Sequence, residues 1–383
     1  MDFELSDEQR LLKDSVERLA AQRYDFEARK KYMKENDGWS RDMWRQYVAL
    51  GLTALPFAEE HGGIGGGPVE TMIVMEAFGR ALALEPYFAT VVLGGGFLRH
   101  GASDTVRRDL LPKVAAGETL LAFAHTERQS RYDLADVATM ATKEDSGYDL
   151  EGAKSLALHG DVADKLIVSA RVSGAQRDRN GIGLFLVDAK APGVSVRGYP
   201  TVDGLRAAEV MLTGVKVDAD AVIGEPGNAY PLIEQVVDSS IAALSAEAVG
   251  AMSAMHDITV DFLKQRKQFG VPIGNFQVLQ HRAGEMLIAL EQARSMAMLA
   301  TMMSEEPNAA ERRKAIAAAK VQIGRSAKFV GESAIQMHGG IGMTMEYKVG
   351  HYFKRVTMID KMFGDADHHL VALARMGGIV GAA

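Results

Sequence analysis

The sequence predicts a multidomain α+β protein with a helical first part, a β-rich middle and a helical last part. Apolar residues recur at helical spacing in residues 1–119, and short β-rich runs separated by turn signals fill residues 120–226. Long apolar-periodic segments follow in residues 227–383. A chain of 383 residues is long enough for two or three domains with sizeable cores.

The composition narrows the class of protein. With 47% hydrophobic and 24% charged residues the chain is a globular protein and not a disordered one. It has no cysteine, which excludes a disulfide framework and thiolate chemistry and fits a reducing compartment. A net charge of −7 argues against nucleic acid or an anionic membrane as the main partner. No apolar run is long enough to span a membrane, and the acidic start Met1–Asp7 has no secretory signal, so we expect a cytoplasmic protein.

The first domain, residues 1–119, is predicted to be all helical. Ser6–Gln9 reads as a capping box before an amphipathic helix. Further helices are expected at Trp44–Leu50, Val69–Leu82 and Val106–Ala116. The glycine-rich segment His61–Gly67 lacks the spacing of a phosphate loop and follows no βαβ pattern, so it is interpreted as a turn.

The middle domain, residues 120–226, is predicted to be a small antiparallel barrel or sandwich. Its strands are expected at Leu120–Ala124, Ala138–Lys143, Leu166–Val172, Gly183–Val187, Val194–Tyr199 and Glu209–Val217. The segment Gly224–Asn228 marks its end.

The last domain, residues 227–383, is predicted to be a helix bundle. Its helices are expected at residues 232–265, 276–303, 309–337 and 366–376. The loop Arg266–Gln280 between the first two of these helices carries the forked guanidinium group of Arg266, an aromatic ring at Phe269 and glycines at 270 and 274. Those groups suit a diphosphate beside an aromatic ring system, although an ordinary helix–helix turn remains open. Gln336–Gly342 again presents bare backbone at a helix end.

Together these two stretches resemble the acyl-CoA dehydrogenase family. The patterns are R-x-Q-F-G-x-P-I-x-x-F-Q and Q-x-x-G-G-x-G, which start 70 residues apart. The resemblance implies an N-terminal all-α domain, a middle antiparallel β-barrel and a C-terminal four-helix bundle. It also implies FAD, an acyl-CoA substrate, an electron acceptor such as an electron-transfer flavoprotein, and an oligomer in which one chain binds part of its neighbour's flavin.

The resemblance assigns two sets of cofactor residues. The set that would bind the neighbour's flavin is complete and comprises Arg266, Phe269, Ile273, Gln277, Gln336, Gly339 and Gly340. The set that would face the chain's own flavin keeps Phe123 and Thr126 in F-A-H-T-E. The family's following P-x-A-G-S-D is replaced by Arg128–Asp133, and Leu156 stands where a ring-flanking tryptophan is usual.

Neither place where the family carries its catalytic glutamate has a carboxylate. The usual place near the C-terminus corresponds to Phe363, and the alternative place corresponds to Ser240, followed by Ile241 where an arginine is usual. Asp238, Glu247, Asp365 and Glu127 are candidates for a substitute base, and each is better explained by a structural role. Asp367–His369 is interpreted as a solvated helix face, not as a metal site.

Over its length the chain most resembles the small subunit of the pimeloyl-CoA dehydrogenase type. The resemblance predicts an FAD-dependent acyl-CoA dehydrogenase subunit acting on a medium-chain or dicarboxylic acyl-CoA, in a heterotetramer whose large subunit supplies the glutamate. The alternatives are a self-sufficient homotetramer with an unconventional base and a non-catalytic structural module; no feature favours a flavin monooxygenase. Arg128 and Arg131 are interpreted as surface loop charges, with contact to a distal carboxylate or a CoA phosphate as the other option.

Overall fold

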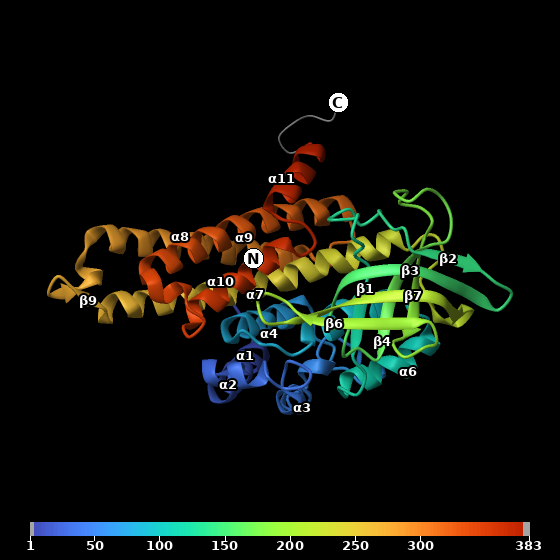
Figure 1. Ribbon diagram of the computed structural model, residues 1–383, viewed down its shortest axis with the longest axis horizontal. Coiled ribbons are helices and arrows are strands. Elements are labelled where there is room, and N and C mark those ends of the chain that lie inside the picture. Colours follow the sequence, from blue (N-terminus) through green and yellow to red (C-terminus); the bar gives the residue numbers. More distant parts are fainter. Residues whose placement is uncertain (1–3, 378–383) are drawn as a thin grey trace. The chain divides into compact units, whose positions relative to one another are not determined.

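The computed structural model describes residues 4–377 (Figure 1). The first three residues of the acidic start lie outside that range. Contacts divide the chain into two compact units. One contains the chain up to Lys31, Pro68–Ala83 and everything from Ile241 onward, and the other contains Tyr32–Gly67 and Leu84–Ser240. Each unit is described by itself below.

The helices of the second unit are short, and serines cap two of them. They are α3 (Arg41–Ala49), η1 (Leu52–Ala54), η2 (Glu59–His61), the π-helix η3 (Phe88–Gly94), α5 (Gly95–Gly101) and α6 (Asp104–Ala115). The Ser40 and Ser103 side chains accept from the backbone N–H groups of Met43 and Val106, which explains where α3 and α6 begin.

The glycine-rich segment between η2 and α4 (Pro68–Ala81) is a closed turn. Four successive N–H groups, from Gly63 to Gly66, donate to backbone carbonyls in residues 54–58. Since these donors are used inside the turn, they do not point outward as a phosphate loop requires. The interpretation of this segment as a turn is confirmed.

The sheet of this unit has eight strands. They are β1 (Leu121–Ala124), β2 (Met140–Lys143), β3 (Gly147–Leu158), β4 (Lys165–Arg171), β5 (Ile182–Asp188), β6 (Val194–Pro200), β7 (Arg206–Asp218) and β8 (Val222–Ile223). The pairing order is β6-β7-β3-β2-β4-β5-β8, with β1 also on β4. Its core includes the fully buried side chains of Leu150, Leu166, Val168, Phe185 and Leu212.

The sheet differs from the sequence-based prediction in two ways. β3 was not predicted, because its polar residues and Gly152 mask the strand pattern, yet it pairs with β7 over most of its length. Two pairs, β1 with β4 and β2 with β4, are parallel, whereas the other pairs are antiparallel as predicted.

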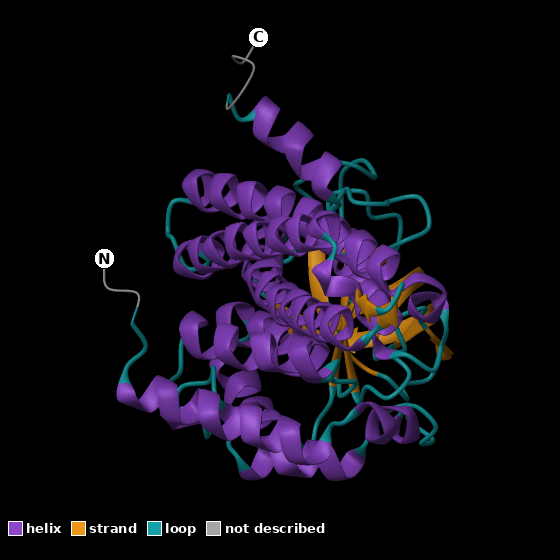
Figure 2. Cartoon of the chain, turned by 90° about the vertical axis from the view of Figure 1, so that its left-hand side faces the viewer, coloured by secondary structure: helices purple, strands orange, loops and turns teal. Residues whose placement is uncertain are grey.

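The other unit is a helical assembly. Its elements are α1 (Asp7–Arg23), α2 (Phe26–Tyr32), α4 (Pro68–Ala81), the greater part of α7 (Tyr230–Gln265), α8 (Gln277–Met303), α9 (Ala309–His338), α10 (Lys348–Lys361) and α11 (Ala366–Arg375). α8 and α9 run side by side (Figures 1 and 2). The capping box at Ser6 and Gln9 forms as predicted. α10 was not predicted, since its start has no side-chain cap and contains Gly350.

Two glycines bring α4 and α7 into backbone contact. A Cβ added to Gly79 of α4 would overlap the carbonyl oxygen of Glu247, and one added to Gly250 of α7 would overlap that of Glu76. Within the described residues, no helix is long and apolar enough to cross a membrane.

Candidate functional site

The two predicted cofactor stretches meet at one end of the bundle. The ring of Phe262, in the last turn of α7, lies 4.4 Å from the ring of His338 at the end of α9. The ring of Tyr347 lies 5.1 Å from His338 on the approach to α10. The carbonyl of Phe262 accepts from the N–H of Arg266 at 2.8 Å, so this aromatic contact ties the start of the arginine loop to the end of α9.

The arginine loop is a β-hairpin with an exposed aromatic tip. β9 (Lys267–Gln268) pairs with β10 (Val271–Pro272), and the carbonyl of Arg266 accepts from Ile273 N at 2.8 Å. The two tip residues have positive φ, 53° at Phe269 and 81° at Gly270. Phe269 is 92% exposed, and its ring centroid lies 6.0 Å from that of Phe276 in an edge-on arrangement. An aromatic residue in a strained, exposed turn indicates a surface that contacts something beyond this chain.

The hairpin leads directly into the start of α8. Ile273 lies in the short 3-10 turn before it, and Gln277 is its exposed first residue. Phe276 precedes α8 and provides no side-chain cap, so the first N–H groups of the helix have no partner from a capping side chain. A helix start of this kind attracts anions, and Arg266 begins the hairpin that leads into it.

The second stretch is a bare backbone turn. Gln336 is exposed on the last turn of α9, and Gly339 ends that helix with φ 62° and ψ −143°, which only glycine adopts readily. A Cβ added to Gly339 or Gly340 would meet nothing within 4 Å. The open space is therefore directly against the peptide backbone.

These groups fit the dinucleotide that the resemblance predicts. Arg266 and the start of α8 suit the diphosphate, Phe269 offers a flat apolar face, and the Gly339–Gly340 backbone leaves room for close approach. Arg266, Phe269, Ile273, Gln277, Gln336, Gly339 and Gly340 thus all lie on the hairpin, the start of α8 and the end of α9. Their individual cofactor contacts stay a prediction.

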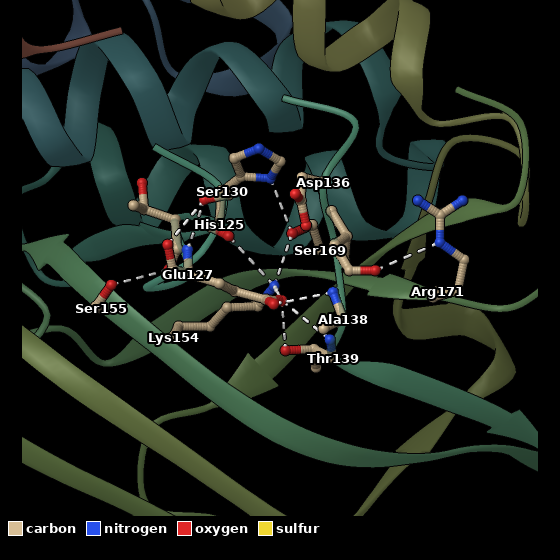
Figure 3. Close-up of polar contacts among 12 residues, drawn as sticks. His125, Glu127, Ser130, Asp136, Ala138, Thr139, Lys154, Ser155, Ser169 and Arg171 are labelled. Carbon is tan, nitrogen blue, oxygen red and sulfur yellow. Dashed lines mark hydrogen bonds and ion pairs between the residues drawn. The ribbon is translucent and has the colours of Figure 1, made fainter. Parts of the chain in front are cut away.

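A buried polar network fixes the segment that carries Thr126 in the other unit (Figure 3). The Lys154 ammonium donates to Glu127 Oε1 at 2.7 Å, to Ser169 Oγ at 3.1 Å and to the His125 carbonyl at 3.3 Å. Ser169 Oγ lies 2.9 Å from His125 Nδ1. Glu127 Oε1 also accepts from the backbone N–H and the hydroxyl of Thr139.

The network makes Glu127 a structural carboxylate. Burial raises its pKa, but the charge and hydrogen bond of Lys154 and further donors outweigh burial and lower the pKa to about 2. A carboxylate so stabilised in its charged form is a poor proton acceptor near neutral pH. Glu127 is therefore not the substitute base.

Thr126 lies at the exposed edge of this network. Its carbonyl accepts from Ser155 N at 2.7 Å, and it is a half-buried residue two positions after the end of β1. Phe123, in β1, is buried, with its ring stacked on His125 at 5.1 Å. The structure therefore places Phe123 in the interior and presents Thr126 nearer the surface; a flavin contact for either stays a prediction.

The departures from the family pattern have visible structural consequences. Leu156, at the tryptophan position, has φ 54° and is 48% exposed, in a β3 bulge. The Arg128 guanidinium pairs with Glu209 at 3.1 Å and is highly exposed, which fits a surface charge. Arg131 is exposed with φ 45°.

Neither base position provides a proton acceptor. Phe363 is half-buried with φ 56°, and its carbonyl accepts from His369 Nε2 at 3.0 Å. Ser240 is fully buried in α7, and its hydroxyl has no hydrogen-bond partner among the described residues. A serine hydroxyl does not remove a weakly acidic carbon-bound proton without an activating base.

Each of the other candidate carboxylates already has an interaction partner. Glu247 makes a two-point ion pair with Arg355, at 2.5 and 2.7 Å. Asp365 caps α11 by accepting from His368 N at 3.0 Å and pairs with Lys361 at 3.1 Å. Asp238 is buried on α7 and also has an interaction partner. Glu247 and Asp365 thus have the structural roles that were predicted for them.

Sequence reasoning missed the aromatic contact that joins the two stretches. Phe262, His338 and Tyr347 come from three separate segments, and no spacing rule relates them. The only signal was the position of His338 immediately before Gly339 and Gly340.

Three family models match successive parts of the chain. They are the acyl-CoA dehydrogenase N-terminal domain over residues 6–118, the middle domain over 122–215 and the C-terminal domain over 232–377. A probable acyl-CoA dehydrogenase of Bacillus subtilis, YngJ, is 27% identical over 98% of this chain and 99% of its own length.

Three solved structures illustrate the likeness of fold. The Tcur3481-Tcur3483 steroid ACAD is 28% identical with a TM-score of 0.87, covering 97% of both chains. The FAD complex of PigA is 25% identical with a TM-score of 0.90, covering 100% of both chains. The ChsE4-ChsE5 complex of Mycobacterium tuberculosis is 24% identical with a TM-score of 0.88, covering 100% of both chains.

Proposed function

Because this chain belongs to the acyl-CoA dehydrogenase family, whose cofactor is FAD, we propose that it is the base-lacking subunit of a heteromeric acyl-CoA dehydrogenase, of the pimeloyl-CoA dehydrogenase small-subunit type. In this proposal the chain binds part of the flavin and a partner supplies the glutamate. The observation that carries it is the contrast between a complete set of groups at the hairpin end and the absence of a carboxylate at Phe363 and Ser240.

Each part of the chain has a defined task in the proposal. When bound, FAD would supply the acceptor for the hydride that leaves the β carbon of the acyl group. Arg266 and the first turn of α8 would bind the diphosphate, and Gly339 and Gly340 would leave room for it against the backbone. A glutamate of the partner would remove the α proton, because Glu127 and Glu247 of this chain are held in ion pairs.

The surface of α8 supports an assembly. Leu287, Ile288 and Met302 lie within about 100° of one another around this helix. They expose 44–61% of their area. Apolar side chains on an outer helix face favour burial against another chain. The Tcur3481-Tcur3483 steroid ACAD, whose name joins two proteins, adds a related precedent for two different chains.

The proposed substrate and the proposed cellular location rest on the resemblance to the pimeloyl-CoA dehydrogenase small subunit. A medium-chain or dicarboxylic acyl-CoA remains the proposed substrate. Because the related Tcur3481-Tcur3483 protein is a steroid ACAD, a steroid-bearing acyl-CoA is the next class to test. The proposed electron acceptor is an electron-transfer flavoprotein, and the proposed location is the cytoplasm.

The flavin spectrum tests this proposal. The chain is purified alone and again with a co-expressed acyl-CoA dehydrogenase that carries the glutamate, and each sample receives a C6–C8 acyl-CoA, its dicarboxylic counterpart or a steroid-bearing acyl-CoA. We expect bleaching only in the pair, with flavin bound once per copy of this chain. Bleaching of the chain alone would instead establish a self-sufficient enzyme, and a colourless chain and pair would establish a structural module.

A further inference from the structure

His351 on α10 has two hydrogen-bond partners that fix its protonation state. Its Nε2 lies 3.0 Å from the carbonyl oxygen of Met345, which only accepts. Its Nδ1 lies 3.4 Å from the Arg29 guanidinium, which only donates. Both bonds form together only when the ring is neutral and carries its proton on Nε2.

Arg29 provides a fixed anchor for this histidine. It lies on α2, is 2% exposed, and its Nε donates to the carbonyl of Leu82 at 2.9 Å. Phe26, on the same helix, packs edge-on to the His351 ring at 4.9 Å. His351 thus connects α2 with the segment that carries Met345.

That segment is the continuation of the Gly339–Gly340 turn. Met345 follows the 3-10 turn Gly339–Met343, and His338 precedes it with Nδ1 bonded to the carbonyl of Ala334 at 2.8 Å. Buried histidines therefore bracket the turn, His338 at its start and His351 beyond its end.

We propose that His351 is a positioning residue for the Gly339–Gly340 backbone, and that it acts only in its neutral form. The identity of the ligand at this turn rests on the proposed function; the positioning does not. A second proton on the ring would point Nδ1–H at Arg29 and break that contact. Acid would then loosen the segment around Met345 and weaken retention of the dinucleotide.

Three cations near His351 oppose its protonation. Arg29 and Lys30 on α2 and Lys354 on α10 are the charged groups that act on the ring, and each is a cation. Burial first, and then these cations, lower the pKa of His351 below its ordinary value of 6.5, although its bond to Met345 acts in the other direction. The contact therefore breaks on the acid side of that value.

The test uses hydrogen exchange of the whole chain without added cofactor, from about pH 7.5 to about pH 4.5. We expect peptides covering residues 339–349 to lose protection about threefold or more at the acid end, after correction for intrinsic exchange. His351→Gln provides an amide that accepts from Arg29 and donates to Met345 without titrating. The exchange protection of the same peptides in this variant should therefore not change with pH. His281→Gln, an exposed histidine on α8, behaves like wild type.

Two results would overturn the proposal. One is a loss of protection in acid for His351→Gln equal to that of wild type. The other is unchanged protection of residues 339–349 in wild type across the whole pH range. The same pH series is then run for flavin retention in the assembled complex. If exchange follows the expected pattern but no flavin binds, the proposed function fails and the positioning role stands.

Discussion

Glu247 on α7 and Arg355 on α10 form a buried two-point ion pair, in which the two side chains are 6% and 5% exposed. The pair occupies one of the carboxylates of α7 that were candidates for a substitute base. It also makes Glu247 a stability element, because removing one partner leaves the other charge buried without compensation.

Glu247→Gln is expected to lower the free energy of unfolding by about 3–5 kcal/mol. Urea unfolding at neutral pH measures this. The double variant Glu247→Met, Arg355→Met is expected to recover most of the loss, because apolar side chains of similar volume replace the ion pair. A single variant as stable as wild type would show that the pair contributes nothing.

Stability in acid is expected to depend on Glu127. Its pKa is lowered from an ordinary 4.5 to about 2, so its stabilising contribution is full above pH 4.5 and disappears as pH falls through about 2. That contribution is about 3 kcal/mol. Unfolding of wild type and Glu127→Gln is compared from neutral pH downward, with exposed Glu118→Gln as control. The difference in free energy of unfolding between wild type and Glu127→Gln should become smaller as the pH falls. A difference that stays constant with pH would contradict this prediction.

Arg266→Ala is expected to reduce flavin retention in the assembled complex by about tenfold or more, because a charge-assisted bond to the diphosphate is lost. Arg266→Lys should recover only part, since an ammonium lacks the forked geometry. Arg325→Ala, an exposed arginine on α9, serves as control. Equal flavin content in Arg266→Ala and the control would remove Arg266 from the site.

Phe269→Asn is expected to have opposite effects on stability and binding. Asparagine adopts positive φ more readily, and Asn-Gly suits this two-residue turn, so the isolated chain should gain about 1 kcal/mol. Little burial is lost, because Phe269 is 92% exposed. Flavin retention in the complex should fall. Unchanged retention would indicate that the exposed ring contacts neither cofactor nor partner.

The sequence predicted elements whose signals are local. The Ser6 capping box, the helices around residues 232–337 and the turn at His61–Gly67 depend on spacing within one segment, and the structure confirms them. β3 was missed because it is stabilised by its pairing with β7, which lies some 60 residues away.

The candidate site was predictable only in part. Arg266, Gly339 and Gly340 carry their own motif, whereas the pairing of Glu247 with Arg355 and of His351 with Arg29 joins residues more than 100 positions apart. Nothing near Glu247 in the sequence reveals that its carboxylate is paired with an arginine. Such long-range compensation is visible only in the folded chain.

The crossing of α4 and α7 at Gly79 and Gly250 limits which substitutions and insertions the fold tolerates. Each glycine faces a carbonyl of the opposite helix, so even the smallest side chain at either position separates the two helices. One residue inserted into α7 between Glu247 and Gly250 would turn everything beyond it by about 100°. Arg266 and its hairpin would then emerge in a different direction from the bundle. Insertions and deletions are therefore tolerated in the loops but not in this stretch of α7.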